Sequence, residues 1–305
     1  MPSAIIKINL YIFLVGLTLF PASLSWSREV TDEIGRSVNV SPRVRRIVSL
    51  APGITETLYA LGLEDKIVGV TTFCDWPARA AEKEKVGGFI NPSLEKIVSL
   101  RPDLILATAD GNRKDTVRQL ERMGLAVYVT NPSDTSGILR GIGHIGEITG
   151  QKQQAARLAA QLRRRLDDIA AQIKGKEKPR VFFQLGLEPV ISAGGGTLIN
   201  EAIERAGGIN VAGQSAARYP RFSAEGIAAA RPDIILLAPM RGDKELKAAK
   251  AFWEKLSVIT AVQQGRIYAV DTDLIGRASP RIVDAIEQMA LIFHPEIKIR
   301  KKTED

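Results

Sequence analysis

A fourteen-residue segment occurs twice in the chain, and this repeat constrains the fold more than any other feature. Residues 93–106 (SLEKIVSLRPDLIL) recur 130 positions later as residues 223–236 (SAEGIAAARPDIIL), with identity at eight of the fourteen positions. In each copy a serine suited to cap a helix precedes apolar residues at helical spacing, and a proline ends the helix before a buried strand. Each half of the chain therefore contains the same helix-to-strand unit, and we predict two related lobes.

Short apolar runs bounded by helical stretches occur in both halves. Such runs are typical of α/β layers in which mainly parallel sheets are buried on both faces. We predict a first lobe over residues 28–150, a connecting helix over 151–174 and a second lobe over 175–305. The runs lie at residues 47–50, 67–70, 104–106, 127–129, 181–183, 234–237 and 267–270.

Residues 151–173 have the pattern of one long helix between the lobes. Five apolar residues recur there at helical spacing, and neither proline nor glycine interrupts them. At 1.5 Å per residue the segment would form a rod of about 35 Å. A helix packed on both lobes restricts their closure, so we expect a rigid connection with a ligand cleft between the lobes. The five residues are Leu158, Leu162, Leu166, Ile169 and Ile173.

The first 27 residues have the pattern of a secretory signal peptide. One charge, Lys7, precedes a nearly continuous apolar run over residues 8–20 and a stretch of mostly small residues that ends at Ser27. A retained membrane anchor is the alternative, but the apolar run of about 13 residues is shorter than the ~20 that span a bilayer. The single cysteine, Cys74, lies far from the expected cut before Arg28. We therefore predict a periplasmic protein that is exported, cleaved near Ser27 and not lipidated.

The composition disfavours several function classes. The chain has 42 Lys and Arg against 34 Asp and Glu, and the excess is dispersed, with no aromatic residues among its basic clusters. A nucleic-acid surface combines both features, so we expect no nucleic-acid partner. With one cysteine and two histidines, His144 and His294, 150 positions apart, we predict no intramolecular disulfide and no metal site, and we interpret both histidines as structural.

Two glycine-rich stretches resemble cofactor-binding motifs, but structural roles explain them better. Residues 141–146 (GIGHIG) match G-x-G-x-x-G, but that motif requires a strand directly before its first glycine. A helical segment precedes it here, so we predict a glycine-containing helix that packs closely on its neighbour. We interpret residues 194–196 (GGG) as a turn. Because no nucleophile elbow, paired-histidine motif or Cys-His couple is present, we predict no cofactor, no catalytic residues and no enzymatic activity; a pair of carboxylates meeting in space stays open.

Several motifs together carry a resemblance to a known family. They are residues 49–56 (SLAPGITE), residues 73–77 (FCDWP), the two S-x-E units and residues 277–281 (RASPR). Over about residues 44–291 the chain resembles the substrate-binding proteins of ABC importers that have a helical backbone, and most closely the vitamin B12 (cobalamin)-binding members. The resemblance implies a monomer that captures a corrinoid between its lobes and delivers it to a permease dimer in the inner membrane.

The resemblance also implies roles for seven residues. Phe73, Phe89 and Tyr219 match aromatic residues that line the family's ligand cleft, and Asp273 and Arg277 match polar residues of a loop that contacts the corrin. Two more residues, Glu95 and Glu225, match the acidic residues that dock into arginine pockets on the permease. Each glutamate also lies in the first turn of a predicted helix, where the helix dipole by itself favours a negative charge. Trp76, near Phe73, suits a cleft role and a core role equally.

Some positions depart from the cobalamin-binding pattern. Thr108, Ile191 and Leu274 replace aromatic residues that other members place in the cleft, and a ferric-siderophore or haem binder is therefore the main alternative. Those ligands are anionic and favour arginines, for which the candidates are Arg113, Arg218, Arg221 and Arg277. A secreted α/β enzyme is a third interpretation. The scarcity of histidine and cysteine favours a metal that arrives inside its own organic chelate.

Overall fold

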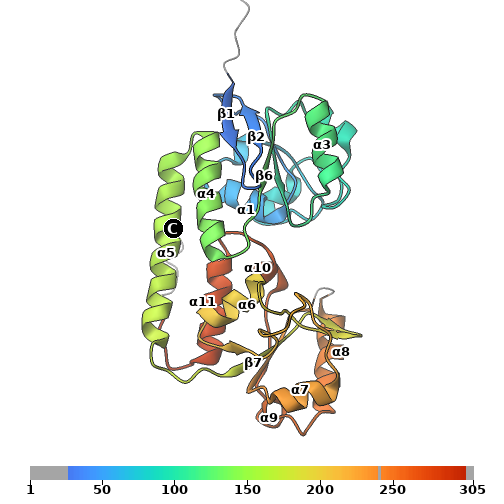
Figure 1. The fold of residues 1–305 in the computed structure, drawn as a ribbon, viewed down its shortest axis with the longest axis vertical. Helices are drawn as coiled ribbons and strands as arrows, with labels where there is room; N and C mark the ends of the chain where they lie inside the picture. The colour runs from blue at the N-terminus through green and yellow to red at the C-terminus, as the bar shows by residue number, and fades with distance from the viewer. Residues whose placement is uncertain (1–26, 240–241, 300–305) are drawn as a thin grey trace, which may run out of the picture.

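The computed structural model describes residues 27–239 and 242–299, and the predicted signal peptide lies almost wholly outside them. Two lobes lie one above the other along a single long helix, α5 (Figure 1). Each lobe contains a four-stranded parallel sheet with helices around it, so the predicted α/β class is confirmed. Within residues 27–239 and 242–299, no helix has the length and apolar character needed to cross a membrane.

The seven predicted strand runs all form strands of the two sheets. The first sheet has the order β4-β3-β5-β6, and the second has the order β10-β7-β11-β12. Only the two-residue strand β10 lacks a predicted run, because two residues are too few to form a pattern. The bounds are β3 Ile47–Ser49, β4 Ile67–Val70, β5 Leu104–Thr108 and β6 Val127–Thr130, then β7 Arg180–Gln184, β10 Ile209–Asn210, β11 Ile234–Leu237 and β12 Ile267–Ala269.

Helices cover these sheets, and two short antiparallel pairs of strands lie outside them. In the first lobe these elements are β1 Arg28–Thr31, β2 Ser37–Val40, α1 Pro52–Ala60, η1 Glu64–Lys66, η2 Ala78–Glu82, α2 Leu94–Ser99, α3 Lys114–Arg122 and α4 Thr135–Thr149. After α5 (Lys152–Ile173) they are β8 Gly186–Leu187, β9 Val190–Ile191, α6 Leu198–Arg205, α7 Ala224–Ala230, α8 Asp243–Glu254, α9 Thr260–Gln263, α10 Thr272–Gly276 and α11 Ile282–Phe293.

The repeated segment forms the same unit in both lobes, α2–β5 and α7–β11. Ser93 and Ser223 cap the two helices, each accepting a backbone N–H three residues on. The chain leaves each helix through an arginine in the left-handed region, Arg101 or Arg231, both at φ 46°. The following proline disfavours the helical conformation at that arginine, and this sharp exit directs the chain into the strand.

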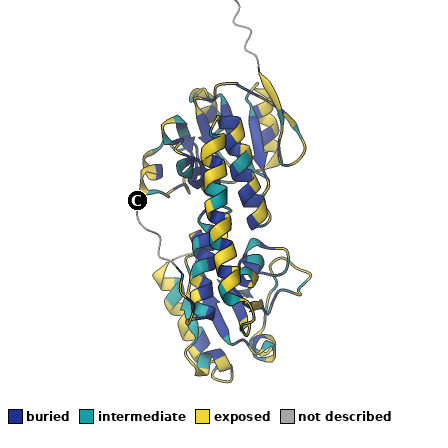
Figure 2. Cartoon of the chain, turned by 90° about the vertical axis from the view of Figure 1, so that its left-hand side faces the viewer, coloured by how far each residue is buried: buried dark blue, intermediate teal, exposed yellow. Residues whose placement is uncertain are grey.

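The predicted connecting helix is α5, and it packs against α4 in the first lobe and against α6 and α11 in the second. Leu162, Leu166 and Ile169 are buried, whereas Leu158 and Ile173 at the two ends are half-buried. Figure 2 shows the exposed side of α5 running along the outside of both lobes. Because this helix contacts both lobes along its length, it is a packed strut rather than a flexible linker.

The glycine motif lies inside α4, which is continuous from Thr135 to Thr149. An added Cβ at Gly146 would lie 2.2 Å from the Cβ of Ala155 on α5, so a glycine is required for the two helices to approach. The predicted close packing is therefore confirmed. The chain reverses through Gly150, which adopts φ 80° at the end of α4, and the predicted turn at residues 194–196 is also present.

Candidate ligand-binding cleft

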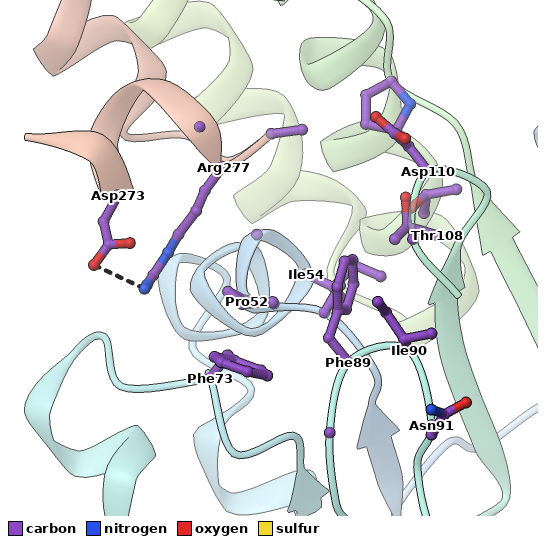
Figure 3. Close-up of a pocket in the computed structure, with 18 residues that line it drawn as sticks. Pro52, Ile54, Phe73, Phe89, Ile90, Asn91, Thr108, Asp110, Asp273 and Arg277 are labelled. Carbon is purple, nitrogen blue, oxygen red and sulfur yellow. Dashed lines mark ion pairs between the residues drawn. The ribbon is translucent and has the colours of Figure 1, made fainter. Parts of the chain in front are cut away.

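A cavity of about 690 Å³ opens between the lobes at the carboxyl ends of the first sheet. Thr108 and Thr130 end strands β5 and β6, and Pro52 begins α1 directly after β3. The ends of parallel strands are the usual binding region of such sheets. Figure 3 shows how the side chains of this cavity lie. Its lining is Ala51, Pro52, Gly53, Ile54, Phe73, Gly88, Phe89, Ile90, Asn91, Thr108, Asp110, Gly111, Thr130, Pro132, Asp273, Gly276, Arg277 and Ala278.

The first lobe supplies the aromatic surface of this cavity, as predicted for Phe73 and Phe89. Phe73 is 58% exposed, so its ring is accessible from the cavity. Phe89 lies over Gly111, where an added Cβ would be 2.1 Å from the ring. Both rings come from loops (Figure 3), and they form part of the apolar lining of the cavity.

A buried amide that the sequence interpretation overlooked holds these loops together. Asn112 donates from Nδ2 to the carbonyl oxygens of Leu50 and Phe89, at 3.1 and 2.8 Å. Its Oδ1 accepts the backbone N–H of Thr108. One side chain therefore ties the Phe89 loop to the ends of strands β3 and β5. An isolated asparagine in a loop has no pattern that predicts such a role.

A second cavity of about 560 Å³ adjoins the first and contains Tyr219, the third predicted aromatic residue. Tyr219 is 53% exposed, and Arg218 beside it lines the same cavity. The two cavities share Asp110, Pro132, Gly276 and Ala278, so they are two parts of one cleft. The remaining residues of the second cavity are Ala109, Asn131, Ser133, Leu185, Thr197, Leu198, Ile199, Thr272 and Ile275.

Arg277 and Asp273 both lie in the first cavity, as predicted, and they pair with each other. The guanidinium of Arg277 lies 2.9 Å from Asp273, 2.8 Å from Asp75 and 2.9 Å from Glu56. Burial disfavours the charged form of Arg277, but its hydrogen bonds to Asp75 and Glu56 outweigh this and raise its pKa. The same guanidinium lowers the pKa of Asp75. Three carboxylates therefore neutralise Arg277.

Glu56 is the centre of this ionic cluster, and sequence reasoning assigned it no role. It lies on α1 of the first lobe with its side chain only 2% exposed, and it contacts Arg277 and Arg281 of the second lobe. Arg281 also stacks 4.1 Å from the ring of Trp76, so Trp76 contacts this interlobe cluster. The signal for Glu56 was present in residues 49–56, where a glutamate ends an otherwise uncharged motif.

The positions that depart from the cobalamin-binding pattern lie in different places. Thr108 lines the first cavity, whereas Leu274 is a buried residue of α10 and Ile191 belongs to β9. Arg113 and Arg221 are exposed, and neither is among the described residues that line the two cavities. They are therefore poor candidates to hold an anionic ligand. Of the four candidate arginines, two line a cavity. Arg277 lines the first and is already ion-paired, whereas Arg218 lines the second and makes no ion pair with a described residue.

The two predicted docking glutamates are exposed on equivalent helices, one in each lobe. Glu95 lies in the first turn of α2 and Glu225 in the first turn of α7. The carboxylate of Glu225 accepts hydrogen bonds from its own backbone N–H and from Ser223, which lower its pKa. Neither residue is among the described residues that line the two cavities.

The scarce residues lie outside both cavities. His294 is buried, with Nε2 3.3 Å from the carbonyl oxygen of Gly207, as expected of a structural residue. His144, also interpreted as structural, is exposed on α4, and its Nδ1 lies 3.1 Å from the carboxylate of Glu33. Cys74 is buried against Thr55 and Thr71. Within the described part of the chain, no group of three His, Cys, Asp or Glu is arranged to hold a metal ion.

Two sheet-containing lobes, a packed connecting helix and an aromatic cleft between them define a solute-binding protein. Residues 47–274 match the family described as periplasmic binding protein, and the chain belongs to this family. It is 31% identical over 245 residues to a vitamin B12-binding protein of Vibrio cholerae, covering 80% of this chain and 87% of that protein. A vitamin B12-binding protein of Photorhabdus laumondii is 30% identical, with 80% and 86% covered.

Solved structures agree with this assignment. The periplasmic vitamin B12 binding protein BtuF of Vibrio cholerae matches with a TM-score of 0.74 and 30% identity, covering 82% of this chain and 96% of that structure. The apo form of the periplasmic heme-binding protein RhuT from Roseiflexus sp. RS-1 matches with a TM-score of 0.73 and 27% identity, covering 83% and 98%. Proteins that bind two different metal chelates therefore share this fold.

Proposed function

We propose that this protein captures a corrinoid, cobalamin or a close relative, in the cleft and delivers it unchanged to an ABC permease. The observation that carries the proposal is the first cavity, where two aromatic rings form part of an apolar lining beside a charge-neutralised polar rim. A corrin is a flat, largely apolar ring with amides around its edge, so it needs aromatic faces and a few hydrogen-bonding groups. The similarity to the vitamin B12-binding proteins supports the same ligand class.

The electrostatics of the first cavity favour a corrinoid over haem. Haem carries propionates that need unpaired cations, and the one arginine in this cavity, Arg277, already contacts three carboxylates. The exposed carboxylates of Asp110 and Asp273 suit the amide N–H groups of a corrin edge and would repel propionates. The described residues lining this cavity also include no histidine, tyrosine, methionine or cysteine; Tyr219, the one such residue of the cleft lining, belongs to the second cavity.

Delivery requires a surface that remains available when the cleft is filled, and Glu95 and Glu225 meet this requirement. They are exposed, lie outside the cleft and repeat once per lobe. We assign them to docking against basic pockets on the two permease subunits. Export agrees with this role, and amino-terminal sequencing of the periplasmic protein should begin at about Arg28.

Ligand identity is tested by absorption spectra of the protein after incubation with cyanocobalamin, haem or a ferric siderophore and desalting. We expect a retained corrin spectrum, and mass spectrometry should recover the ligand chemically unchanged. Phe73→Ala should weaken binding about tenfold, because a stacked aromatic face is lost. Val258→Ala, which removes another exposed apolar side chain, is the control. Retention of haem or siderophore in preference to cobalamin would refute the corrinoid assignment.

A further inference from the structure

Three of the sequence motifs meet at one junction between the lobes, although they lie far apart in the chain. They are residues 49–56 and 73–77 of the first lobe and residues 277–281 of the second. At Gly53 an added Cβ would lie 2.5 Å from the carbonyl oxygen of Ala278, so the backbones of the two lobes touch there. The proposed function uses one aromatic ring and one arginine of these motifs and leaves the other residues without a role.

Charged side chains from both lobes surround this backbone contact. Glu56 on α1 is 2% exposed, and its Oε1 accepts hydrogen bonds from Arg277 at 2.9 Å and from Arg281 at 3.2 Å. The side chains of the two arginines are only 12% and 16% exposed. Arg277 also donates to Asp75, and Arg281 stacks over Trp76. Each of the two arginines therefore contacts both motifs of the first lobe.

This arrangement resists separation of the lobes. If the lobes moved apart, Glu56 would lose both of its cations, and Arg281 has no other ion-pair partner among the described residues. Separating a buried ion pair is costly, because each charge is left without compensation in a poorly hydrated place. The junction is also part of the cleft wall, since Gly53, Arg277 and Ala278 line the first cavity. The spacing of the lobes at the junction therefore sets the width of that cavity.

The junction is a second attachment between the lobes, apart from α5. Figure 1 shows α5 along one side of both lobes. A further interlobe contact lies on that same side, where Glu201 of α6 accepts the backbone N–H and the hydroxyl of Thr135 at 2.7 Å each, because α4 and α6 both pack on α5. With these contacts alone the lobes are free to rock about α5. Attachment at a second place removes that freedom.

We infer that the three motifs form a latch that holds the lobes at one spacing before any ligand is bound, with Glu56 as its positioning residue. The latch consists of Glu56, Asp75 and Trp76 on the first lobe and of Arg277 and Arg281 on the second. The inference goes beyond the proposed function, because the latch acts whichever ligand is captured. A cleft that is held at its working width spends less binding free energy on ordering the lobes, so the latch preorganises the protein for its ligand.

The test is the distance between spin labels at Gln119→Cys and Lys247→Cys, measured by double electron–electron resonance without ligand. Both positions are exposed, on α3 and α8. These helices lie on the side of the lobes away from α5 (Figure 1), so rocking about α5 changes their distance strongly. The native cysteine, Cys74, is buried and is replaced by serine in every variant. We expect one narrow distance distribution when the latch is intact.

Glu56→Gln removes the charge and keeps the size of the side chain, so the distribution should broaden toward longer distances. Arg281→Met should broaden it less, because Arg277 still pairs with Glu56. Glu64→Gln is the matched control, since it removes an ion pair to Arg79 within the first lobe, and it should leave the distribution unchanged. Thermal unfolding of each variant separates a change of spacing from a loss of folding.

A calorimetric titration of cyanocobalamin is the second readout, and it alone rests on the proposed function. Glu56→Gln should weaken binding about threefold, which corresponds to about a third of the molecules holding the latched spacing. An unchanged distance distribution in Glu56→Gln would overturn the inference, and so would a broadened distribution with unchanged affinity. A protein with an intact latch that binds no cyanocobalamin would refute the proposed function, and the distance distributions would still decide the inference.

Discussion

The two lobes are built on the same unit, down to side chains outside the repeated segment. Asp103 accepts the backbone N–H groups of Arg45 and Arg46, and Asp233 accepts that of Arg180. The side chains of Arg46 and Arg180 in turn donate to carbonyl oxygens at the ends of α2 and α7. An arginine and an aspartate thus join helix and strand in each lobe.

The lobes differ in how they attach to α5. In the first lobe Gly146 allows α4 to approach Ala155 closely, so the joint depends on shape. In the second lobe Arg165 lies 2.6 Å from Asp284 of α11 and also pairs with Glu287, so the joint depends on charge. The repeat therefore explains the internal structure of each lobe. The contacts with α5 that fix one lobe relative to the other differ between the two lobes.

Reversing the charge of both docking glutamates should have the largest effect. Glu95→Lys with Glu225→Lys should abolish permease binding and transport, because basic pockets would face two new cations, and should leave ligand affinity unchanged. Transport by reconstituted permease and calorimetry of the ligand measure the two effects. Glu254→Lys with Asp167→Lys, both exposed elsewhere, is the charge-matched control. Loss of ligand affinity would place the glutamates in the cleft, and unequal single variants would show that the two lobes dock differently.

The joint of the first lobe is tested by Gly146→Leu. The added side chain would collide with Ala155, so the free energy of unfolding should fall by about 3 kcal/mol. Gly143→Ala is the matched control in the same helix, since an added Cβ there meets no atom within 4 Å; it should stabilise by about 0.5–1 kcal/mol. Denaturant unfolding measures both. Equal effects of the two substitutions would contradict the close approach of α4 and α5.

The joint of the second lobe is tested by Arg165→Met. Its side chain is 19% exposed, and its loss removes the ion pairs to Asp284 and Glu287. We expect destabilisation of about 2 kcal/mol, reduced at high salt because the remaining repulsion is screened. The Gly146→Leu effect should not depend on salt. If salt changes the destabilisation by the two substitutions to the same extent, the view that one joint depends on shape and the other on charge is wrong.

The equivalence of the two units is tested by Asp103→Ala and Asp233→Ala. Asp103→Ala removes the hydrogen bonds from two backbone N–H groups before β3, and Asp233→Ala removes the one from Arg180 at the start of β7. Each substitution should lower the free energy of unfolding by about 1 kcal/mol. Because the two sites lie in separate lobes, the effects should add in the double variant. If the two variants lose different amounts of unfolding free energy, or if their effects do not add in the double variant, the two units have the same shape but different energetics.

The smallest expected effect is a pH dependence at the contact between the lobes. Arg277 lowers the pKa of Asp75 below its ordinary value of 3.8 in the folded protein. The resulting stability is fully present above that value and is lost as the pH falls through the lower, folded-state pKa. Asp75 is 58% exposed, so the effect should stay below about 1 kcal/mol. Unfolding of wild type and Asp75→Asn between pH 2.5 and 6 should converge at the acid end; parallel curves would contradict the pairing.

Much of the fold was predictable because its signals are local. Apolar runs, capping serines and prolines act within a few residues, and they located seven of the eight strands of the two four-stranded sheets, the connecting helix and the repeat. The residues predicted for the cleft came from motifs, and Phe73, Phe89, Asp273 and Arg277 do line the first cavity while Tyr219 lines the second. Their roles toward a ligand remain predictions that the titrations test.

The residues that escaped prediction act over long distances in the sequence. Glu56 meets Arg277 across 221 positions, and Asn112 reaches Leu50 across 62. No local pattern shows that a glutamate on a helix is buried or that an asparagine in a loop joins two strands. For the same reason Arg113, Arg218 and Arg221 were equal candidates until the fold placed only Arg218 in a cavity.

The sequence alone determined that the chain forms two α/β lobes of one design with a helix between them, because hydrophobic period, caps and breakers act locally. The tertiary structure alone decided how the lobes meet: through a glycine contact, one ion-paired arginine and a cluster around Glu56. It also decided that the cleft has an apolar part and a polar part, because both arise where segments distant in the chain converge. Charge pairing and cavity shape are properties of that convergence and not of any one segment.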